Sequence, residues 1–467
     1  MVKVQSRKYF LKDLKIQIKL AFLTLNKRSW KTTRIDIKIF DMRYFQLTVV
    51  LFFFSFLISN AQQNKFYYEN AVYNEKIKSV QIYVAGLELS QPVINLGGDA
   101  YLLFKFDDLS DEPKDYYYTV IHCDADWNES YINQSEYISG FPVNPITDYK
   151  LSFNTTFNYT NYQLLLPNDN MKLNYSGNYV LVVFEDNDKE KVVLTQRFYI
   201  AEQKVTITGT VHRATNDPFE GSNHEVDFVV THNNVPIENP LKDVKVVIMQ
   251  NGRWDNAIRN LKPLYIRQNR LEYDYQKENV FAAGNEFRFF DNRSNKFNGE
   301  YVASTDFHQP YYHKTLLKDE VRANKNFFLY KEMNGKYTVE SQDKEVRIPD
   351  TECDYTFVHF TLPLPSILLG GTVNVFGALS GWNANKSNEM TWNFDTSAYE
   401  LTLLLKQGYY NYMYVYVPQG ATSADHTNIE GSFWETENEY QIFVYYSDFA
   451  ARYTRLVGYQ IFNSTQQ

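Results

Sequence analysis

The clearest fold signal in this chain is a pair of apolar segments, Asn178-Tyr-Val-Leu-Val-Val-Phe-Glu185 and Lys191-Val-Val-Leu-Thr-Gln-Arg-Phe-Tyr-Ile200, joined through Asp186-Asn-Asp188. Aromatic and β-branched side chains favour strands, because they pack well on a pleated surface. Asp and Asn tolerate the left-handed backbone that tight turns need. The stretch therefore predicts an antiparallel β-hairpin.

Similar signals run along most of the chain, with turn residues about every ten positions. No window shows a sustained helical stripe with caps. The pattern predicts an all-β protein built from about three tandem immunoglobulin-like β-sandwich domains. An outer-membrane barrel is disfavoured because the strands are uneven and many carry charge at alternate positions. The other clear strand candidates are residues 80–84, 101–106, 115–121, 205–211, 224–230, 243–249, 269–275, 286–291, 337–340, 355–361, 371–377, 400–405, 409–417 and 439–446.

The N-terminal region resembles an export signal. Residues 42–61 combine a basic start at Arg43, an apolar run over 45–58 and small residues before Gln62. We expect a signal peptide cleaved between Ala61 and Gln62. An uncleaved anchor is the alternative, although the apolar run is shorter than the ~20 residues of a membrane span. Residues 1–41 are interpreted as an over-extended gene start or a long leader.

Charge is distributed unevenly along the chain. The 467 residues carry a net charge of −8, but residues 1–61 hold twelve of the 47 Lys/Arg and three of the 55 Asp/Glu. The remaining 406 residues therefore have 35 basic and 52 acidic side chains, a net charge of −17. This balance argues against a nucleic-acid partner, which would require a basic face. We expect domains at 62–203, 204–346 and 347–467, with the polar stretch 347–354 as a linker.

The two cysteines, Cys123 and Cys353, both lie in the part predicted to be exported. Two interpretations stay open: a disulfide formed in an oxidising compartment, or two buried thiols in separate domains. Neither follows the cleavage site, which disfavours a lipid anchor. There is no CxxC pair to support a zinc ribbon or a redox site.

The densest polar cluster is His122-Cys-Asp-Ala-Asp-Trp-Asn-Glu-Ser130. A catalytic thiol is disfavoured, since adjacent strand residues point to opposite faces and His122 could not easily serve Cys123. A calcium loop of the EF-hand kind fails, because positions six and twelve are Glu129 and Ser135 rather than Gly and Glu. A looser calcium loop remains an alternative. The favoured interpretation is a turn shaped by Asp124, Asp126 and Asn128, with Trp127 buried.

Known catalytic motifs give no support for an enzyme. The chain has no Gly-rich phosphate loop, HExxH or GxSxG motif, and its eight histidines form no i, i+4 pair. Paired carboxylates are abundant, but an acidic sequence produces them by chance. We predict a non-enzymatic protein with no cofactor, no metal and no small-molecule substrate.

Residues 371–417 resemble immunoglobulin-like glycogen-binding modules. The resemblance rests on Thr372-Val-Asn-Val-Phe-Gly-Ala-Leu-Ser-Gly-Trp-Asn383, followed by Gly408-Tyr-Tyr-Asn-Tyr-Met-Tyr414. In such modules an exposed Trp stacks on a sugar, which would give that role to Trp382. The alternative is that Trp382 closes the end of the sandwich core, and this is favoured because the fold recurs in many proteins that bind no sugar.

Several blocks together resemble the plug protein family of the type IX secretion system. They are Tyr118-Thr-Val-Ile-His-Cys-Asp-Ala-Asp-Trp127, Glu136-Tyr-Ile-Ser-Gly-Phe141, Ile146-Thr-Asp-Tyr-Lys-Leu-Ser-Phe-Asn-Thr-Thr156, Tyr159 with Tyr162, Leu166-Pro-Asn168, Ser176-Gly-Asn-Tyr179, Ala283-Gly-Asn-Glu-Phe-Arg-Phe-Phe-Asp291 and Ile429-Glu-Gly-Ser-Phe-Trp-Glu-Thr-Glu-Asn438. The resemblance covers nearly all of 62–467. It assigns no role to Glu286. The residues that it marks as structural are His122, Cys123, Asp124, Asp126, Trp127, Asn154 and Trp382.

The resemblance implies a periplasmic protein, held at the outer membrane by a very large translocon barrel whose periplasmic opening it plugs. The rival hypotheses are a periplasmic glycan-binding module and an assembly or chaperone factor of the cell envelope. The contact residues of the partner stay open at this point.

Overall fold

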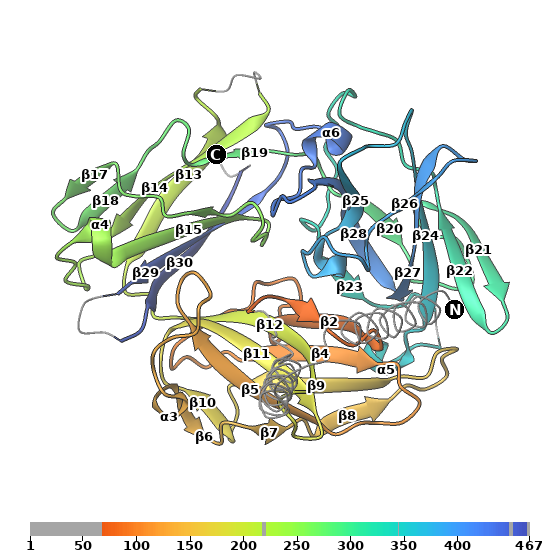
Figure 1. Ribbon diagram of the computed structural model, residues 1–467, viewed down its shortest axis with the longest axis horizontal. Coiled ribbons are helices and arrows are strands. Elements are labelled where there is room, and N and C mark those ends of the chain that lie inside the picture. Colours follow the sequence, from red (N-terminus) through yellow and green to blue (C-terminus); the bar gives the residue numbers. More distant parts are fainter. Residues whose placement is uncertain (1–67, 217–220, 344, 448–451, 465–467) are drawn as a thin grey trace, which may run out of the picture. The chain divides into compact units, whose positions relative to one another are not determined.

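The computed structural model describes residues 68–216, 221–343, 345–447 and 452–464. The predicted leader 1–41, the signal peptide 42–61 and the Ala61/Gln62 cleavage site lie outside these residues. Within the described ranges, no helix has the length and apolarity needed to cross a lipid bilayer. The described fold is all-β: antiparallel ladders dominate, and they pack as three β-sandwiches (Figure 1).

The first sandwich packs a six-stranded sheet against a four-stranded sheet. The predicted hairpin is confirmed as β11 and β12, and its turn residues Asp186 and Asn187 have φ of 54° and 57°. A small ladder of β6 with β10 and the short helix α3 complete this part. Its strands are β1 (Ala71–Val72), β12 (Val192–Ala201), β11 (Gly177–Glu185), β5 (Tyr116–Cys123), β7 (Asn144–Pro145) and β3 (Val93–Asn95) in one sheet; β2 (Ile77–Val84), β4 (Leu102–Asp108), β9 (Thr160–Leu166) and β8 (Asp148–Leu151) in the other; and β6 (Ile138–Gly140), β10 (Met171–Leu173) and α3 (Gln134–Tyr137) beside them.

The second sandwich is completed by the last two strands of the chain. Strand β15 pairs along its whole length with β29, about 190 residues later, as Figure 1 shows for the green and dark-blue strands. Its elements are β13 (Thr206–Arg213), β14 (Asn223–Thr231), β18 (Arg270–Tyr273), β17 (Tyr265–Arg267) and β19 (Val280–Ala282) in one sheet; β16 (Ile258–Arg259), β15 (Val244–Gln250), β29 (Glu439–Tyr446) and β30 (Arg455–Asn463) in the other; and α4 (Pro240–Asp243).

The third sandwich is inserted between β19 and β29 of the second. Its sheets enclose a core rich in aromatic rings, including Phe290, Phe360 and Tyr412. Its elements are β20 (Arg288–Asp291), β28 (Gly408–Pro418), β23 (Tyr337–Val339) and β25 (Gly371–Phe376) in one sheet; β21 (Val302–His308), β22 (Tyr311–Leu316), β24 (Tyr355–Pro363), β27 (Ala398–Lys406) and β26 (Thr391–Asn393) in the other; and α5 (Pro349–Glu352), η1 (Ala378–Ser380) and α6 (Thr427–Glu430).

The sheets therefore divide the chain differently from the expected boundaries at 203/204 and 346/347. The first boundary follows the sheets. The second does not, since residues 288–291 already belong to the third sandwich and residues 439–463 return to the second. The physical reason is that strand signals report local conformation, whereas the partner of a strand is fixed by packing at long range.

Candidate functional site

The polar block at 122–130 forms the predicted turn. The Asp124 carboxylate accepts hydrogen bonds from the backbone N–H groups of Asp126 (2.8 Å) and Asn128 (2.9 Å), and from the Asn128 amide. Trp127 takes a left-handed φ of 66° and is only 4% exposed. The carboxylate of Asp124 is thus used to stabilise the turn, as the favoured interpretation required, and Asp126 instead forms an ion pair with Lys245 of β15.

His122 and Cys123 point to opposite faces of β5, which removes the thiol–imidazole pair as a nucleophile. His122 Nδ1 lies 2.7 Å from Ser130 Oγ and Nε2 lies 3.0 Å from the Ser176 carbonyl oxygen. Burial lowers the pKa of His122 to about 4 and raises the pKa of the Cys123 thiol well above its ordinary value. Cys353 is also a buried free thiol, so the two cysteines are not disulfide-bonded.

Cys123 and Trp127 belong to an apolar seam between the first and second sandwiches. The outer face of β11 and β12 packs there against the outer face of β15, β29 and β30. Because both faces of β11 are covered, its side chains are buried almost without a break. The buried members of the seam are Cys123, Ala125, Trp127, Val180, Val182, Phe184, Tyr199, Ala201, Val247, Met249, Phe443, Tyr445 and Leu456.

Trp127 meets its neighbours at one end of this seam. Its ring is edge-to-face with Tyr199 and with Trp254 of the second sandwich, each at 5.5 Å. The guanidinium of Arg197 lies 4.2 Å from the Trp127 ring and 5.1 Å from the Trp254 ring. Burial lowers the pKa of Arg197 to about 10, so it stays charged at neutral pH and cation–π attraction holds the group together.

Trp382 is half-buried rather than an open platform. It has a left-handed φ of 60° and packs edge-to-face against Phe287 (6.0 Å) and Phe376 (5.7 Å). Asn154 has a φ of 59° and is exposed in the loop between β8 and β9, where asparagine tolerates that conformation.

Asp126, Trp127 and Trp382 meet at one cavity, whereas His122, Cys123 and Asn154 lie elsewhere. All three sandwiches contribute to this cavity, which has a volume of about 260 Å³. Sequence reasoning did not single out Arg197, Trp254 or Arg259, because an isolated Arg or Trp in a strand or loop carries no signal of such a junction. The lining residues are Glu69, Asn70, Asp126, Trp127, Arg197, Gly252, Trp254, Asp255, Arg259, Gly381, Trp382, Asn383 and Thr422.

A buried ion pair joins the first and third sandwiches. Lys406 Nζ lies 2.6 Å from Asp107 Oδ2, and the two side chains are 2% and 0% exposed. The Asp107 carboxylate also accepts hydrogen bonds from Tyr355 (2.7 Å) and Asn161 (2.7 Å). The polar stretch 347–354 is part of this joint, since Asp350 pairs with Lys105 at 3.0 Å.

The two distant segments 283–291 and 429–438 are in direct contact. Asn285 donates to the Glu430 carbonyl oxygen (2.8 Å), and Thr436 Oγ1 donates to the Gly284 carbonyl oxygen (2.9 Å). Burial alone would raise the pKa of Glu430, but ion pairs with Arg288 and Arg322 lower it to about 2. Because the two segments contact each other, both belong to one structural joint.

Residues 77–202 match the family model described as the type 9 secretion system plug protein 1st domain. A crystal structure of a hypothetical protein from Parabacteroides merdae superposes with a TM-score of 0.83 at 37% identity, over 85% of this chain and all of that chain. A putative membrane anchored protein from Corynebacterium diphtheriae aligns over 82% of this chain and 90% of its own at 11% identity, with a TM-score of 0.12. No curated protein matches the chain.

The matched first domain contains the block at 122–127, and the structural likeness extends to the whole of the Parabacteroides chain. The chain belongs to the type IX secretion system plug protein family.

Proposed function

We propose that this protein is a non-enzymatic, periplasmic plug that binds the outer-membrane translocon barrel of the type IX system and covers its periplasmic opening. The observation that carries the proposal is the match of residues 77–202 to the plug first domain, in a chain whose three sandwiches share buried joints. A cap over a wide pore must resist deformation, and joints built from buried apolar and paired charged groups supply that resistance.

The charged and nucleophilic residues discussed in the preceding section support a structural rather than a catalytic role. Asp124 caps a turn, the two thiols are buried with raised pKa, and Glu430 and Asp107 are each paired with a cation. A catalytic group needs access to a substrate and a pKa suited to its task. These residues instead stabilise turns and joints.

The glycan-binding alternative has weaker support. Sugar stacking needs an open aromatic face, whereas two aromatic rings pack against Trp382. Under the plug proposal, Trp382→Ala changes stability and leaves barrel binding in place. The alternative would be favoured if the wild type binds sugar and a folded Trp382→Ala variant does not.

The proposal is tested by affinity purification of the tagged, exported chain from detergent-solubilised envelopes, with mass spectrometry of what co-purifies. We expect a large β-barrel of the type IX system in near-stoichiometric amount. The matched control is Lys386→Met, whose side chain is 88% exposed and which should recover the same barrel. Failure to recover a barrel, under conditions that keep the translocon intact, would contradict the proposal.

A further inference from the structure

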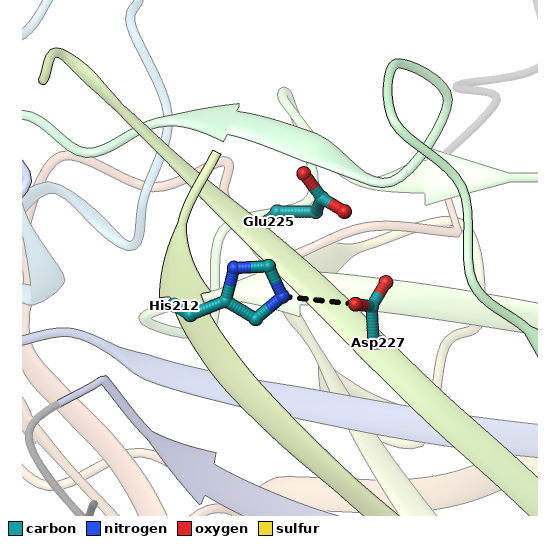
Figure 2. Close-up of side chains that lie close together, drawn as sticks. All are labelled: His212, Glu225 and Asp227. Carbon is teal, nitrogen blue, oxygen red and sulfur yellow. Dashed lines mark hydrogen bonds and ion pairs between the residues drawn. The ribbon is translucent and has the colours of Figure 1, made fainter. Parts of the chain in front are cut away.

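Three side chains that commonly ligate metals gather on the face of the β13–β14 ladder that points away from the core of the second sandwich (Figure 2). His212 lies on β13 and faces Glu225 directly across the antiparallel ladder with β14. Asp227 follows Glu225 by two residues, so both carboxylates project from the same face of β14. Figure 2 shows the His212 imidazole and the Asp227 carboxylate facing each other, with the Glu225 carboxylate beside them.

The candidate ligand atoms all lie within 4.8 Å of one another. His212 Nδ1 is 2.8 Å from the Arg213 carbonyl oxygen, which needs a donor and so places a proton on Nδ1. A neutral ring then presents the Nε2 lone pair, and Nε2 lies 2.9 Å from Asp227 Oδ2. Two acceptors approach this closely only if the ring carries a second proton or a cation binds both.

Outer hydrogen bonds orient both carboxylates. Asn279 Nδ2 donates to Asp227 Oδ1 (2.9 Å), and the Thr215 N–H donates to Glu225 Oε2 (2.7 Å). Among the described residues nothing donates to Glu225 Oε1. Ligands of bound metals are commonly held in this way, with one atom fixed by the protein and the other directed at the ion.

The local charge favours a cation. Glu225 is 1% exposed, and among the described residues no Lys or Arg forms an ion pair with Glu225 or Asp227. A buried carboxylate needs a compensating positive charge. His212 can supply at most one charge for two carboxylates, and a divalent ion would balance both.

We propose that His212, Glu225 and Asp227 bind one divalent transition-metal cation such as Zn²⁺ or Mn²⁺, with water completing the coordination. One imidazole nitrogen with two carboxylate oxygens suits these ions, whereas Ca²⁺ prefers a shell of oxygens. The Nε2–Oδ2 distance of 2.9 Å is close to the ~3 Å between two ligands that meet one ion at right angles, each about 2.1 Å away. The ion would tie the edge strand β13 to β14.

The test is isothermal titration of the purified full chain, stripped with a chelator, with ZnCl₂, MnCl₂ and CaCl₂ in turn. We expect one equivalent of Zn²⁺ or Mn²⁺ and no saturable Ca²⁺ binding. His212→Gln and Asp227→Asn should each weaken binding at least 10-fold. The His212 side chain is 35% exposed, so His212→Gln should keep the fold. Unchanged melting of each metal-free variant checks this directly.

The matched control is a second histidine pair on the third sandwich, where His313 Nδ1 lies 2.9 Å from His359 Nε2. His313→Ala should leave the affinity of the proposed site unchanged. The proposal is overturned by any of three results: no saturable binding to the wild type, binding of equal strength to folded His212→Gln and Asp227→Asn, or loss of binding in His313→Ala alone.

Discussion

At the scale of single residues, the side chains of the family block at 122–127 point in different directions and stabilise different parts of the fold. His122 serves the core of the first sandwich, Cys123 and Trp127 serve the seam with the second, and Asp124 fixes the turn between them. Strand alternation predicts the split between His122 and Cys123. The partner of Trp127 across the seam is not predictable, because Trp254 lies 127 residues away in an irregular loop.

Trp127 and Trp382 should differ in what their removal costs. Trp127→Ala leaves a cavity in a closed seam and should lower the free energy of unfolding by about 3–5 kcal/mol. Trp382 is only half-buried, so Trp382→Ala should cost about half as much. Urea unfolding of both variants measures this. Equal costs, or a larger cost for Trp382→Ala, would contradict the assignment of Trp127 to the seam.

Two carboxyl groups, those of the buried Glu286 and the half-buried Glu332, should make stability depend on pH. Burial raises the pKa of Glu286 to about 7 and of Glu332 to about 8. The Glu437 carboxylate adds to the shift of Glu286, and the Glu286 carboxylate adds to the shift of Glu332. A raised folded-state pKa stabilises the protein at low pH, and that contribution is lost as pH rises from about 4.5 to about 8. Glu332→Gln should therefore be more stable than the wild type at pH 8, by about 1 kcal/mol or more, with little difference at pH 5. Thermal melting at both pH values checks this, and a difference that is the same at both would be inconsistent with it.

At the scale of elements, local signals predicted strands well and their partners poorly. The β11–β12 hairpin follows from its turn residues. The partner of β15 does not, because β29 lies beyond the whole third sandwich. A contiguous division of the chain was the natural expectation, and the insertion of one sandwich into another leaves no local trace in the sequence.

This insertion predicts which fragments fold. Residues 204–346 should not fold alone, because β15 would lose its partner β29 and expose an apolar sheet face. Residues 204–282 joined by a flexible linker to 439–464 should give a cooperatively unfolding domain. Circular dichroism during urea titration distinguishes the two. Cooperative unfolding of 204–346 by itself would contradict the sheet order.

At the scale of the whole molecule, the joints decide whether three sandwiches act as one body. The seam around Trp127 is apolar, whereas the joint around Lys406 is charged and hydrogen-bonded. A buried ion pair is weak evidence for added stability, and in some proteins such pairs fix which surfaces meet. We infer that the Lys406 joint fixes how the first and third sandwiches meet.

Breaking one half of the Lys406–Asp107 pair should be costly. Lys406→Met leaves the fully buried Asp107 carboxylate without its cation, so the free energy of unfolding should fall by about 3–5 kcal/mol. Adding Asp107→Leu should recover part of that loss, because the unpaired charge disappears. Urea unfolding of the single and double variants measures both. A loss below about 1 kcal/mol for Lys406→Met would show that the joint is open to water.

The most direct test of the plug proposal is leakage through the outer membrane. In a strain that lacks this gene, uptake of a large polar antibiotic should rise, and complementation with the wild type or with Lys386→Met should restore the barrier. The leak should also disappear when the translocon gene is deleted as well. An unchanged barrier in the single deletion, with the translocon present at its normal level, would contradict the proposed function.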